Sequence, residues 1–147
     1  MLEFQTILPP FAPRFIDEVS ALASDIFGAF DRDELTWRMA HMPDSSVHLA
    51  RDSELVGFKV GYASARRRYH SWLGGVRAGW RRQGIAQRLM SLQHDWLGSR
   101  GYASVETAMT PDNVAMLALN MQAGFRIIGS RSQGEHTRVM LAKSLVR

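Results

Sequence analysis

The sequence contains no cysteine among its 147 residues. Disulfide bridges and thiolate zinc sites are therefore excluded, and so is a cysteine nucleophile. Long apolar runs are also lacking, because no stretch approaches the roughly 20 apolar residues that a membrane-spanning helix needs. The first residues, with an early Glu3 and the adjacent Pro9 and Pro10, do not have the pattern of a signal peptide. We therefore expect a soluble, cytoplasmic protein with no membrane partner.

Neither the composition nor the length suggests an unusual chain. Hydrophobic residues make up 46% and charged residues 22% of the sequence, proportions typical of folded globular proteins. The length suits one domain, and no repeat, linker or compositional break divides it. We therefore treat residues 1–147 as a single domain.

The charge balance is modestly basic, with 18 Lys and Arg against 14 Asp and Glu, a net charge of +4. Such an excess is compatible with nucleic-acid binding or with a site for a polyanionic small molecule, such as a nucleotide phosphate. No recognised nucleic-acid-binding motif accompanies it, so we rank nucleic acid as the weaker alternative. The five histidines show no metal-ligand spacing, and we expect no metal site.

Hydrophobic spacing and turn residues predict an alternation of strands and helices. We expect strands at 2–8, 47–51, 55–65, 69–76, 103–109, 125–132 and 137–145. Helices are expected from Pro13 to Gly28, between Asp31 and Pro43, at 84–97 and at 114–123, the last with Asp112 as its N-cap. The order β-α-α-β-β-β-α-β-α-β-β predicts a mixed sheet with helices in one α/β fold.

The most informative segment is VRAGWRRQGIA at residues 76–86, which passes from a strand through a loop into a helix. The free N–H groups at a helix start, together with the positive end of its dipole, attract anions. Gly84 and Ala86 would let a pyrophosphate approach this backbone closely, and Arg81 and Arg82 could add charge-assisted hydrogen bonds. Small residues at a helix start are common, so this pattern alone does not identify a site.

The segment is more informative when it is taken together with the features that follow it in the sequence, which are a strand, Asn113, a short helix and Gly124-Phe125. This order and spacing, from Trp72 to Phe125, resembles the GCN5-related N-acetyltransferase (GNAT) superfamily. The resemblance implies the acyl-CoA N-acyltransferase-like fold, a single-domain mixed and mostly antiparallel sheet flanked by helices. It also implies transfer of an acetyl group from acetyl-CoA to a primary amine, by direct attack in a ternary complex.

The resemblance further implies where acetyl-CoA would lie, in a V-shaped opening between the strand ending at Val76 and the strand ending at Met109. The loop amides from Arg82 to Gln87 would hold the pyrophosphate, and Asn113 would bind the pantetheine arm. The implied binding residues are Val76, Arg81, Arg82, Gln83, Gly84, Ile85, Ala86, Gln87 and Asn113.

Gly74 and Gly75 inside a predicted strand suggest a bulge or a close backbone approach. In the family a backbone N–H of this strand polarises the thioester carbonyl, and Gly74 is our candidate for it. The alternative is that the two glycines only make room for Trp72 or Trp80.

The chain departs from the family at Asn120, where relatives often have a tyrosine that protonates the departing thiolate. An amide can donate a hydrogen bond but cannot give up a proton near neutral pH. Water, the acceptor amine or Tyr69 would then supply it. An inactive relative that only binds acyl-CoA therefore stays an alternative function.

The general base is expected on the central strand. In one branch of the family a glutamate stands there, eleven residues before the first position of the loop motif, and that position is His70 in this chain. An imidazole titrates near ~6.5 and suits proton transfer at neutral pH. Alternation along a regular strand would place His70 and Gly74 on the same face. Glu106 is the second candidate for the base. Packing or a hydrogen bond could also explain the presence of either residue.

The sequence does not name the acceptor, which could be a small-molecule amine or a peptide amine. We expect its recognition surface on the first two helices and the turn at 66–68. Three arginines in a turn also suit plain solvation, and the alternatives are contact with an acidic acceptor or with the CoA 3′-phosphate. A homodimer is compatible with the sequence, which does not determine the oligomeric state.

Overall fold

The computed structural model describes residues 1–146. Strands in this range are β1 (Glu3–Ile7), β2 (Ser46–Asp52), β3 (Glu54–Ala65), β4 (Arg68–Val76), β5 (Ser104–Met109), β6 (Arg126–Gln133) and β7 (His136–Ser144). The α-helices are α1 (Pro13–Phe27), α2 (Arg32–His41), α3 (Ile85–Ser99) and α4 (Val114–Gln122), and a short 3-10 helix, η1 (Ala78–Trp80), precedes α3. The predicted order of strands and helices is confirmed.

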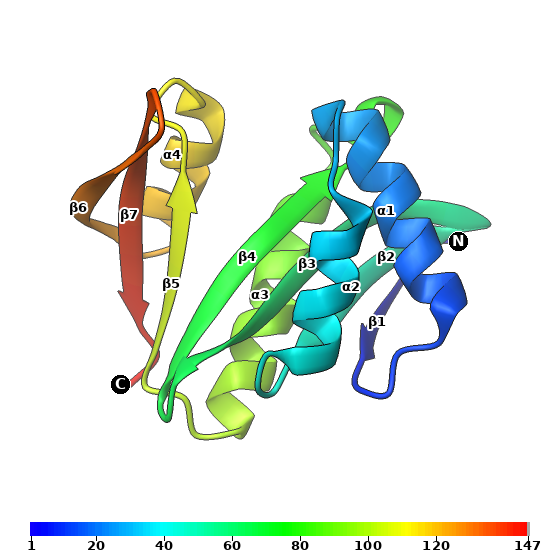
Figure 1. The fold of residues 1–147 in the computed structure, drawn as a ribbon, viewed down its shortest axis with the longest axis horizontal. Coiled ribbons are helices and arrows are strands. Elements are labelled where there is room, and N and C mark those ends of the chain that lie inside the picture. Colours follow the sequence, from blue (N-terminus) through cyan, green and yellow to red (C-terminus); the bar gives the residue numbers. More distant parts are fainter. Residues whose placement is uncertain (147) are drawn as a thin grey trace.

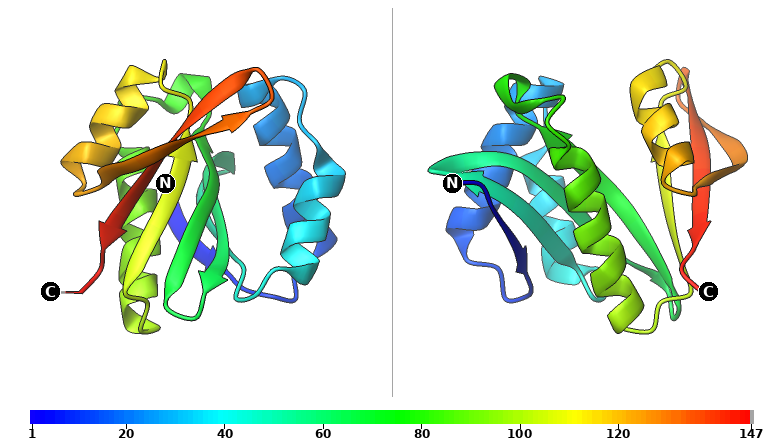
Figure 2. Two further views of the ribbon diagram at one scale, coloured as in Figure 1. Left: turned by 60° about the vertical axis from the view of Figure 1, so that its left-hand side comes forward. Right: turned by 180° about the vertical axis from the view of Figure 1, so that it is seen from behind.

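The strands form one sheet in the order β1-β2-β3-β4-β5-β7-β6. Neighbouring strands are antiparallel except β4 and β5, which run parallel. Helices α1 and α2 cover one face, and α3 and α4 cover the other (Figures 1 and 2). The mixed, mostly antiparallel sheet flanked by helices is therefore confirmed. Within residues 1–146, no helix is both long and apolar enough to cross a bilayer.

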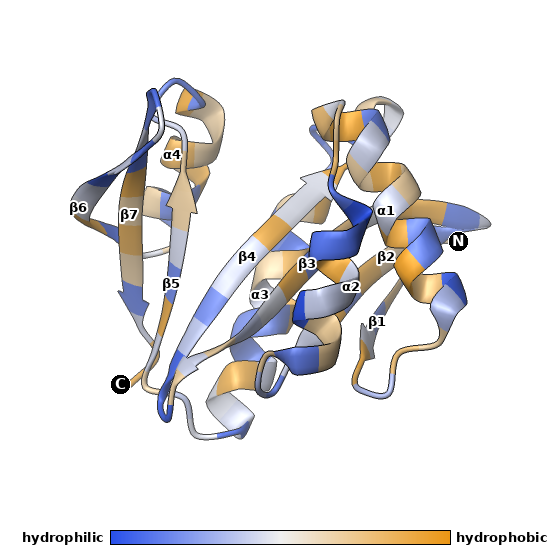
Figure 3. Cartoon of the chain, in the orientation of Figure 1, coloured by the Kyte–Doolittle hydropathy of each residue, from blue (hydrophilic) through white to orange (hydrophobic). Residues whose placement is uncertain are grey.

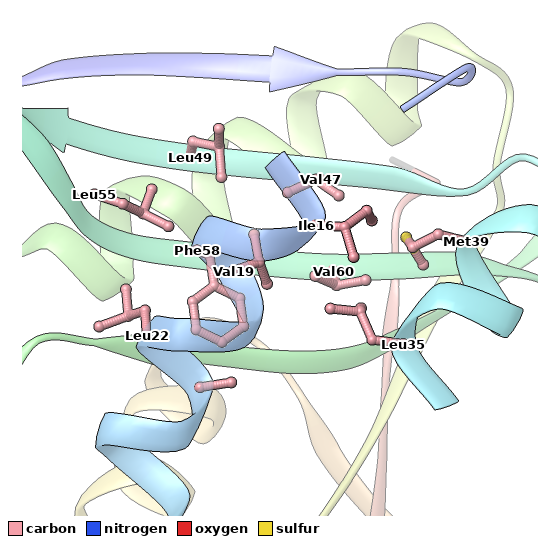
Figure 4. Packing of buried hydrophobic residues seen from close by; sticks show 11 residues of the cluster. Ile16, Val19, Leu22, Leu35, Met39, Val47, Leu49, Leu55, Phe58 and Val60 are labelled. Atoms are coloured by element: carbon pink, nitrogen blue, oxygen red, sulfur yellow. The ribbon is translucent and has the colours of Figure 1, made fainter. Parts of the chain in front are cut away.

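Each face of the sheet carries its own apolar core. On one face, Ile16, Val19 and Leu22 of α1 pack against Phe58 and Val60 of β3 (Figure 4). Their spacing of three residues places them on one side of the helix. On the other face, a second cluster joins α3 to β4, β5 and β7, with Tyr69, Leu97, Val105 and Leu141 fully buried. The two cores fix β4 and β5 at the centre of the molecule.

Helix ends follow the local chemistry of the sequence, with one correction. Helix α1 ends at Gly28, whose φ of 81° suits glycine, and the Asp31 side chain caps α2 by accepting from the Glu34 N–H at 3.1 Å. The prediction of Asp112 as the cap of α4 is wrong. Asn113 holds that position, and its Oδ1 accepts from the Met116 N–H at 3.2 Å.

Two turns are tighter than the sequence suggested. Arg68 already belongs to β4, so the β3–β4 turn consists of Arg66 and Arg67 alone. The last hairpin turns at Gly134 and Glu135, because Gln133 pairs with His136. Hydropathy colouring shows both turns as hydrophilic ends of their hairpins (Figure 3).

The irregularity in β4 lies at Trp72 and not at the paired glycines. Val60 pairs with Leu73 while the next residue, Gly61, pairs with Ser71, so Trp72 is an extra residue in the strand. Gly74 pairs regularly with Lys59. A bulge bends its strand and shifts the alternation of side chains between the two faces. The expectation that His70 and Gly74 lie on the same face of the sheet is therefore wrong, because the bulge places them on opposite faces.

Candidate active site

The site is built on the short parallel ladder between β4 and β5. Four rungs join the strands, from Arg68↔Ser104 to Ser71↔Thr107. The Thr107 hydroxyl donates to the Ser71 carbonyl at 2.9 Å at the last rung. Beyond it the strands diverge towards Val76 and Met109, as the ribbon shows (Figure 1). The ladder between β4 and β5 therefore ends where the resemblance implied a V-shaped opening.

Backbone geometry directs the Gly74 N–H into this opening. The Arg77 N–H donates to the Val56 carbonyl of β3 at 2.7 Å. Backbone groups in an antiparallel pair alternate between the two sides of a strand, and the register is regular from Val76 back to Leu73. The N–H groups of Leu73 and Gly75 therefore face β3, and that of Gly74 faces away from β3. The Gly74 amide is thus available at the edge of β4.

Gly74 and Gly75 do not lie against Trp72 or Trp80, the tryptophans named as alternatives, but against other residues. A Cβ on Gly75 would lie 2.7 Å from Ile26 Cδ1 of α1. A Cβ on Gly74 would lie 3.6 Å from both Cγ and Nζ of Lys59, on the opposite face of the sheet. Neither Trp72 nor Trp80 is among these neighbours. Gly75 therefore has a packing role, and Gly74 lies under the Lys59 side chain.

The loop before α3 presents unsatisfied backbone donors. Arg82 and Gly84 both adopt left-handed φ angles, 64° and 76°, which turn the chain sharply into α3. The first intrahelical bond runs from the Arg88 N–H to the Gly84 carbonyl at 3.0 Å. Among residues 1–146, none accepts from the N–H groups of Ile85, Ala86 or Gln87. A Cβ built on Gly84 would have no atom within 4 Å, so the space beside this residue is open to an anion.

The expected binding residues divide into exposed and buried ones. Arg81, Arg82, Gln83 and Gln87 are exposed, whereas the Ile85 side chain is buried against Leu89 and contributes only its backbone to the loop. Arg81 is anchored, since its Nε donates to the Val76 carbonyl at 3.2 Å.

Asn113 lies at the other arm of the opening, after the end of β5. Its Oδ1 is engaged in capping α4, and its Nδ2 has no partner among the described residues. This nitrogen can therefore donate to a ligand without disturbing the cap.

The two candidate bases lie side by side. His70 and Glu106 are register partners, and His70 Nδ1 lies 4.0 Å from Glu106 Oε1. The His70 ring stacks on Tyr62 at 5.4 Å, and the Tyr62 hydroxyl accepts from Arg38 of α2 at 2.7 Å. Burial lowers the pKa of His70; Glu106 opposes this shift, and nearby arginines reinforce it. The imidazole is therefore neutral at pH 7 and can accept a proton.

Both candidate bases line a cavity of about 640 Å³ on the α2 face. This volume falls within the range of small-molecule sites. Its polar, aromatic and sulfur-containing lining comes from Arg38, Met42, Tyr62, Ser64, His70, Trp72, Glu106, Arg131, Gln133, Arg138 and Met140. Helix α2 contributes as expected, but neither helix α1 nor the 66–68 turn does. Arg66 instead lines a smaller cavity beside Asp44 and Tyr102.

Asn120, at the position of the family's tyrosine, and Tyr69, the alternative acid, both lie in closed surroundings. Asn120 is a buried residue of α4, and its Nδ2 donates to Met109 Sδ at 3.5 Å. Tyr69 is fully buried on the α3 face, and its hydroxyl donates to the Asp44 carbonyl at 2.9 Å and contacts Ser46 Oγ at 2.6 Å. Burial raises the pKa of Tyr69 far above its ordinary value. Its enclosed hydroxyl and raised pKa argue against Tyr69 as the acid that protonates the thiolate.

Sequence reasoning missed Lys59, whose side chain crosses Gly74 on the α3 face. Its ammonium forms neither a hydrogen bond nor an ion pair with any other residue of 1–146. Burial lowers the pKa of Lys59 to about 8, because desolvation disfavours the ammonium form. No local signal marked this residue, because a lysine between Phe58 and Val60 follows the ordinary alternation of polar and apolar residues in a strand.

The family of the chain follows from its sequence as well as its fold. The acetyltransferase (GNAT) family model matches residues 16–125, most of the chain. The fold, the divergence of β4 and β5 and the glycine-led start of α3 agree with this match to an acetyltransferase family. The chain belongs to the GNAT acetyltransferase family. No curated protein matches its sequence.

Solved structures with the same fold cover nearly the whole chain. The ribosomal-protein-S18-alanine N-acetyltransferase from Escherichia coli has a TM-score of 0.84 at 13% identity, covering 100% of this chain and 96% of that one. Ard1 from Thermoplasma volcanium has a TM-score of 0.83 at 18% identity, covering 97% and 99%. An aminoglycoside 6'-N-acetyltransferase complexed with coenzyme A has a TM-score of 0.81 at 17% identity, covering 99% and 98%. At such low identities, the TM-scores show a shared fold.

Proposed function

We propose that the protein transfers an acetyl group from acetyl-CoA to a primary amine, by direct attack of the amine in a ternary complex. The observation that carries the proposal is the Gly74 N–H at the edge of an opening that lies between the α3 loop and the His70–Glu106 pair. Family membership and the CoA complex of one structural neighbour support the same donor. Acetyl-CoA supplies the acetyl group as a reactive thioester.

The phosphates of acetyl-CoA, the acetyl donor, fit the loop before α3. The amides of Ile85, Ala86 and Gln87 are free to donate, and the arginines Arg81 and Arg82 add positive charge at the same end of the helix. Asn113 Nδ2 is the donor left over for an amide carbonyl of the pantetheine arm. Together these groups fix the thioester against the edge of β4.

The Gly74 N–H is proposed to polarise the acetyl carbonyl. A single preorganised donor of this kind contributes about 10²–10³ in rate where it has been removed from other enzymes. The missing side chain lets the carbonyl approach the backbone, which a bulky residue at position 74 would prevent.

His70 is proposed to take the proton that the acceptor amine must lose. A primary amine with a pKa near ~10 is mostly protonated at pH 7 and cannot attack in that form. The neutral imidazole of His70 lines the acceptor cavity, and Glu106 at 4.0 Å can stabilise the imidazolium that results. Glu106 stays the second candidate for the same role, directly or through water.

Lys59 is proposed to protonate the departing thiolate, a role that Asn120 cannot fill. Its ammonium lies against Gly74 on the α3 face, opposite the face that carries His70. A lysine whose pKa is about 8 matches a thiol, which ionises near ~8.5. The base and the acid would then act from opposite faces of the sheet.

The test is a coupled measurement of binding and turnover. Acetyl-CoA should raise the melting temperature by mass action, and CoA-thiol release should be screened over polyamines, amino acids, aminoglycosides and peptide amines. If millimolar acetyl-CoA leaves the melt unchanged, the proposal fails. Tight binding without turnover of any acceptor would instead favour an inactive acyl-CoA-binding protein, the function that Asn120 keeps open.

A further inference from the structure

Two arginines face each other directly across the last hairpin. Arg131 of β6 and Arg138 of β7 are register partners, and both line the cavity that holds His70 and Glu106. Directly opposite residues have Cβ atoms about 4.5–5.5 Å apart, and like charges in that position destabilise the pair. The hairpin therefore carries an unfavourable arrangement at the place where the cavity opens onto it.

Nothing in the described chain neutralises this pair. Within residues 1–146, neither guanidinium forms an ion pair. Arg138 Nη2 donates to the Ala108 carbonyl at 2.9 Å, while its Nε is buried and lacks a hydrogen-bond partner. The cavity's third arginine differs, because Arg38 Nε donates to the Glu34 carboxylate at 2.7 Å. A buried donor without a partner is costly, and such a group is usually satisfied by an ordered water or a ligand.

The pair lies within electrostatic reach of the proposed base. Both Arg131 and Arg138 contribute to lowering the pKa of His70. Glu106 is the one acidic side chain among the described lining residues, against three arginines. The cavity thus has an acidic and imidazole-bearing side at β4–β5 and a cationic side at β6–β7.

We propose that Arg131 and Arg138 form a subsite for an anionic group, a carboxylate or a phosphate, carried by the acceptor amine itself. The planar guanidinium fork matches both groups in two-point hydrogen bonding. The acceptor is then a small molecule that bears an amine at one end and an anion at the other, and polycationic amines are disfavoured. This inference rests on the proposed acetyl transfer, whose acceptor class it specifies.

The test compares amines of equal length and similar basicity. The ω-amino acids of three to six carbons are assayed against the matching amino alcohols and against aminoalkyl phosphates, by CoA-thiol release. We expect kcat/KM for the anionic acceptors to exceed that of the alcohols by about 10- to 100-fold, the worth of a charge-assisted hydrogen bond. A higher value for the phosphates than for the carboxylates would identify the anion as phosphate, and the reverse would identify it as carboxylate.

Charge reversal with a matched control locates the effect. Arg131→Glu should abolish the preference for anionic acceptors while leaving the KM for acetyl-CoA unchanged. Arg126→Glu changes an exposed arginine of the same strand outside the cavity, and should retain the preference. Equal turnover of amino alcohols and amino acids by the wild-type protein would overturn the subsite and leave acetyl transfer standing.

A binding measurement decides the matter if no acceptor in the set turns over. The N-acetylated ω-amino acids should raise the melting temperature of the wild-type protein and not that of Arg131→Glu. The absence of any such shift in the wild-type protein would overturn the subsite. The response to acetyl-CoA alone, measured in parallel, tests the proposed function separately.

Discussion

His70 and Glu106 stand opposite each other in the parallel ladder, with Nδ1 and Oε1 4.0 Å apart, one rung before β4 and β5 separate. Either side chain could accept the amine proton, so the pair must be separated by mutation. His70→Gln should lower kcat/KM by roughly 10²-fold or more at pH 7, the usual size of a general-base effect.

The pH profile distinguishes the two residues. Because the pKa of His70 is lowered, activity that depends on the neutral imidazole should rise with pH through an inflection below ~6.5. His70→Gln should remove this inflection and keep the affinity for acetyl-CoA. If only Glu106→Gln removes it, Glu106 is the base and His70 packs against Tyr62.

Gly84→Glu should abolish the thermal stabilisation by acetyl-CoA. The new carboxylate would occupy the open space over the free amides of α3 and repel phosphate. Because the φ of 76° also strains any residue with a Cβ, Gly84→Asn serves as a conformational comparison, since asparagine tolerates this region. Gly98→Glu, at the exposed far end of the same helix, should leave the shift intact.

Variants at position 74 distinguish a catalytic role of the Gly74 N–H from a need for the space that a glycine leaves. Gly74→Ala places its Cβ at ordinary contact distances, 3.4 Å from the Phe58 carbonyl and 3.6 Å from Lys59, and should fold. It keeps the N–H and should retain most of kcat. Gly74→Pro removes the N–H but no ladder bond to β3, and should lower kcat by about 10²–10³. Equal activity of both variants would exclude the amide as the carbonyl donor.

Lys59→Met should lower kcat and remove a loss of activity that sets in as pH rises through about 8, where the ammonium deprotonates. Lys59→Arg keeps the positive charge, but a guanidinium does not release a proton near neutral pH. Rescue by arginine would therefore indicate an electrostatic role. A donor thioester with a more acidic thiol should restore turnover in Lys59→Met, since its thiolate leaves without protonation.

Two buried histidines predict a loss of stability in mild acid. Burial lowers the pKa of His48 to about 4 and that of His94 to about 3, while in the unfolded chain each titrates near 6.5. The unfolded state therefore binds more protons below 6.5, and the free energy of unfolding falls as pH decreases. Each histidine should account for a loss of roughly 2 kcal/mol between about pH 7.5 and 5.

Urea unfolding at the two pH values measures this loss. His48→Gln and His94→Gln should each show a smaller difference between the two pH values than the wild-type protein. His136→Gln, an exposed histidine, should leave the difference unchanged. An unchanged difference in both buried variants would show that the histidines titrate alike in the folded and unfolded states.

The element order and the cofactor loop could be predicted from the sequence because they depend on local signals. Apolar spacing in 13–28 and the Asp31–Glu34 pair act within a single helix, and Gly84 marks the start of α3 by its own conformational freedom. The arrangement of the strands in the sheet was predicted from the family resemblance, because no local sequence pattern specifies it.

The features that the sequence could not show depend on pairing between distant residues. The bulge at Trp72 exists only in the register of β4 against β3, and it moves Gly74 to the face opposite His70. The Arg131–Arg138 pair likewise depends on the length of the turn in the last hairpin. In the sequence, Lys59 looks like an ordinary lysine of a strand. Only the structure shows that it lies beside Gly74.

The divergence of β4 and β5 leaves a sheet edge in the middle of the fold. Past Ser71, outward-facing backbone groups of β4 such as the Gly74 N–H have no strand beside them, and exposed edges of this kind invite the addition of another chain. An acyl-CoA molecule in the opening would compete with such a chain for the same groups. Solubility on storage should therefore rise with added CoA, and aggregation of the ligand-free protein should begin at this internal edge.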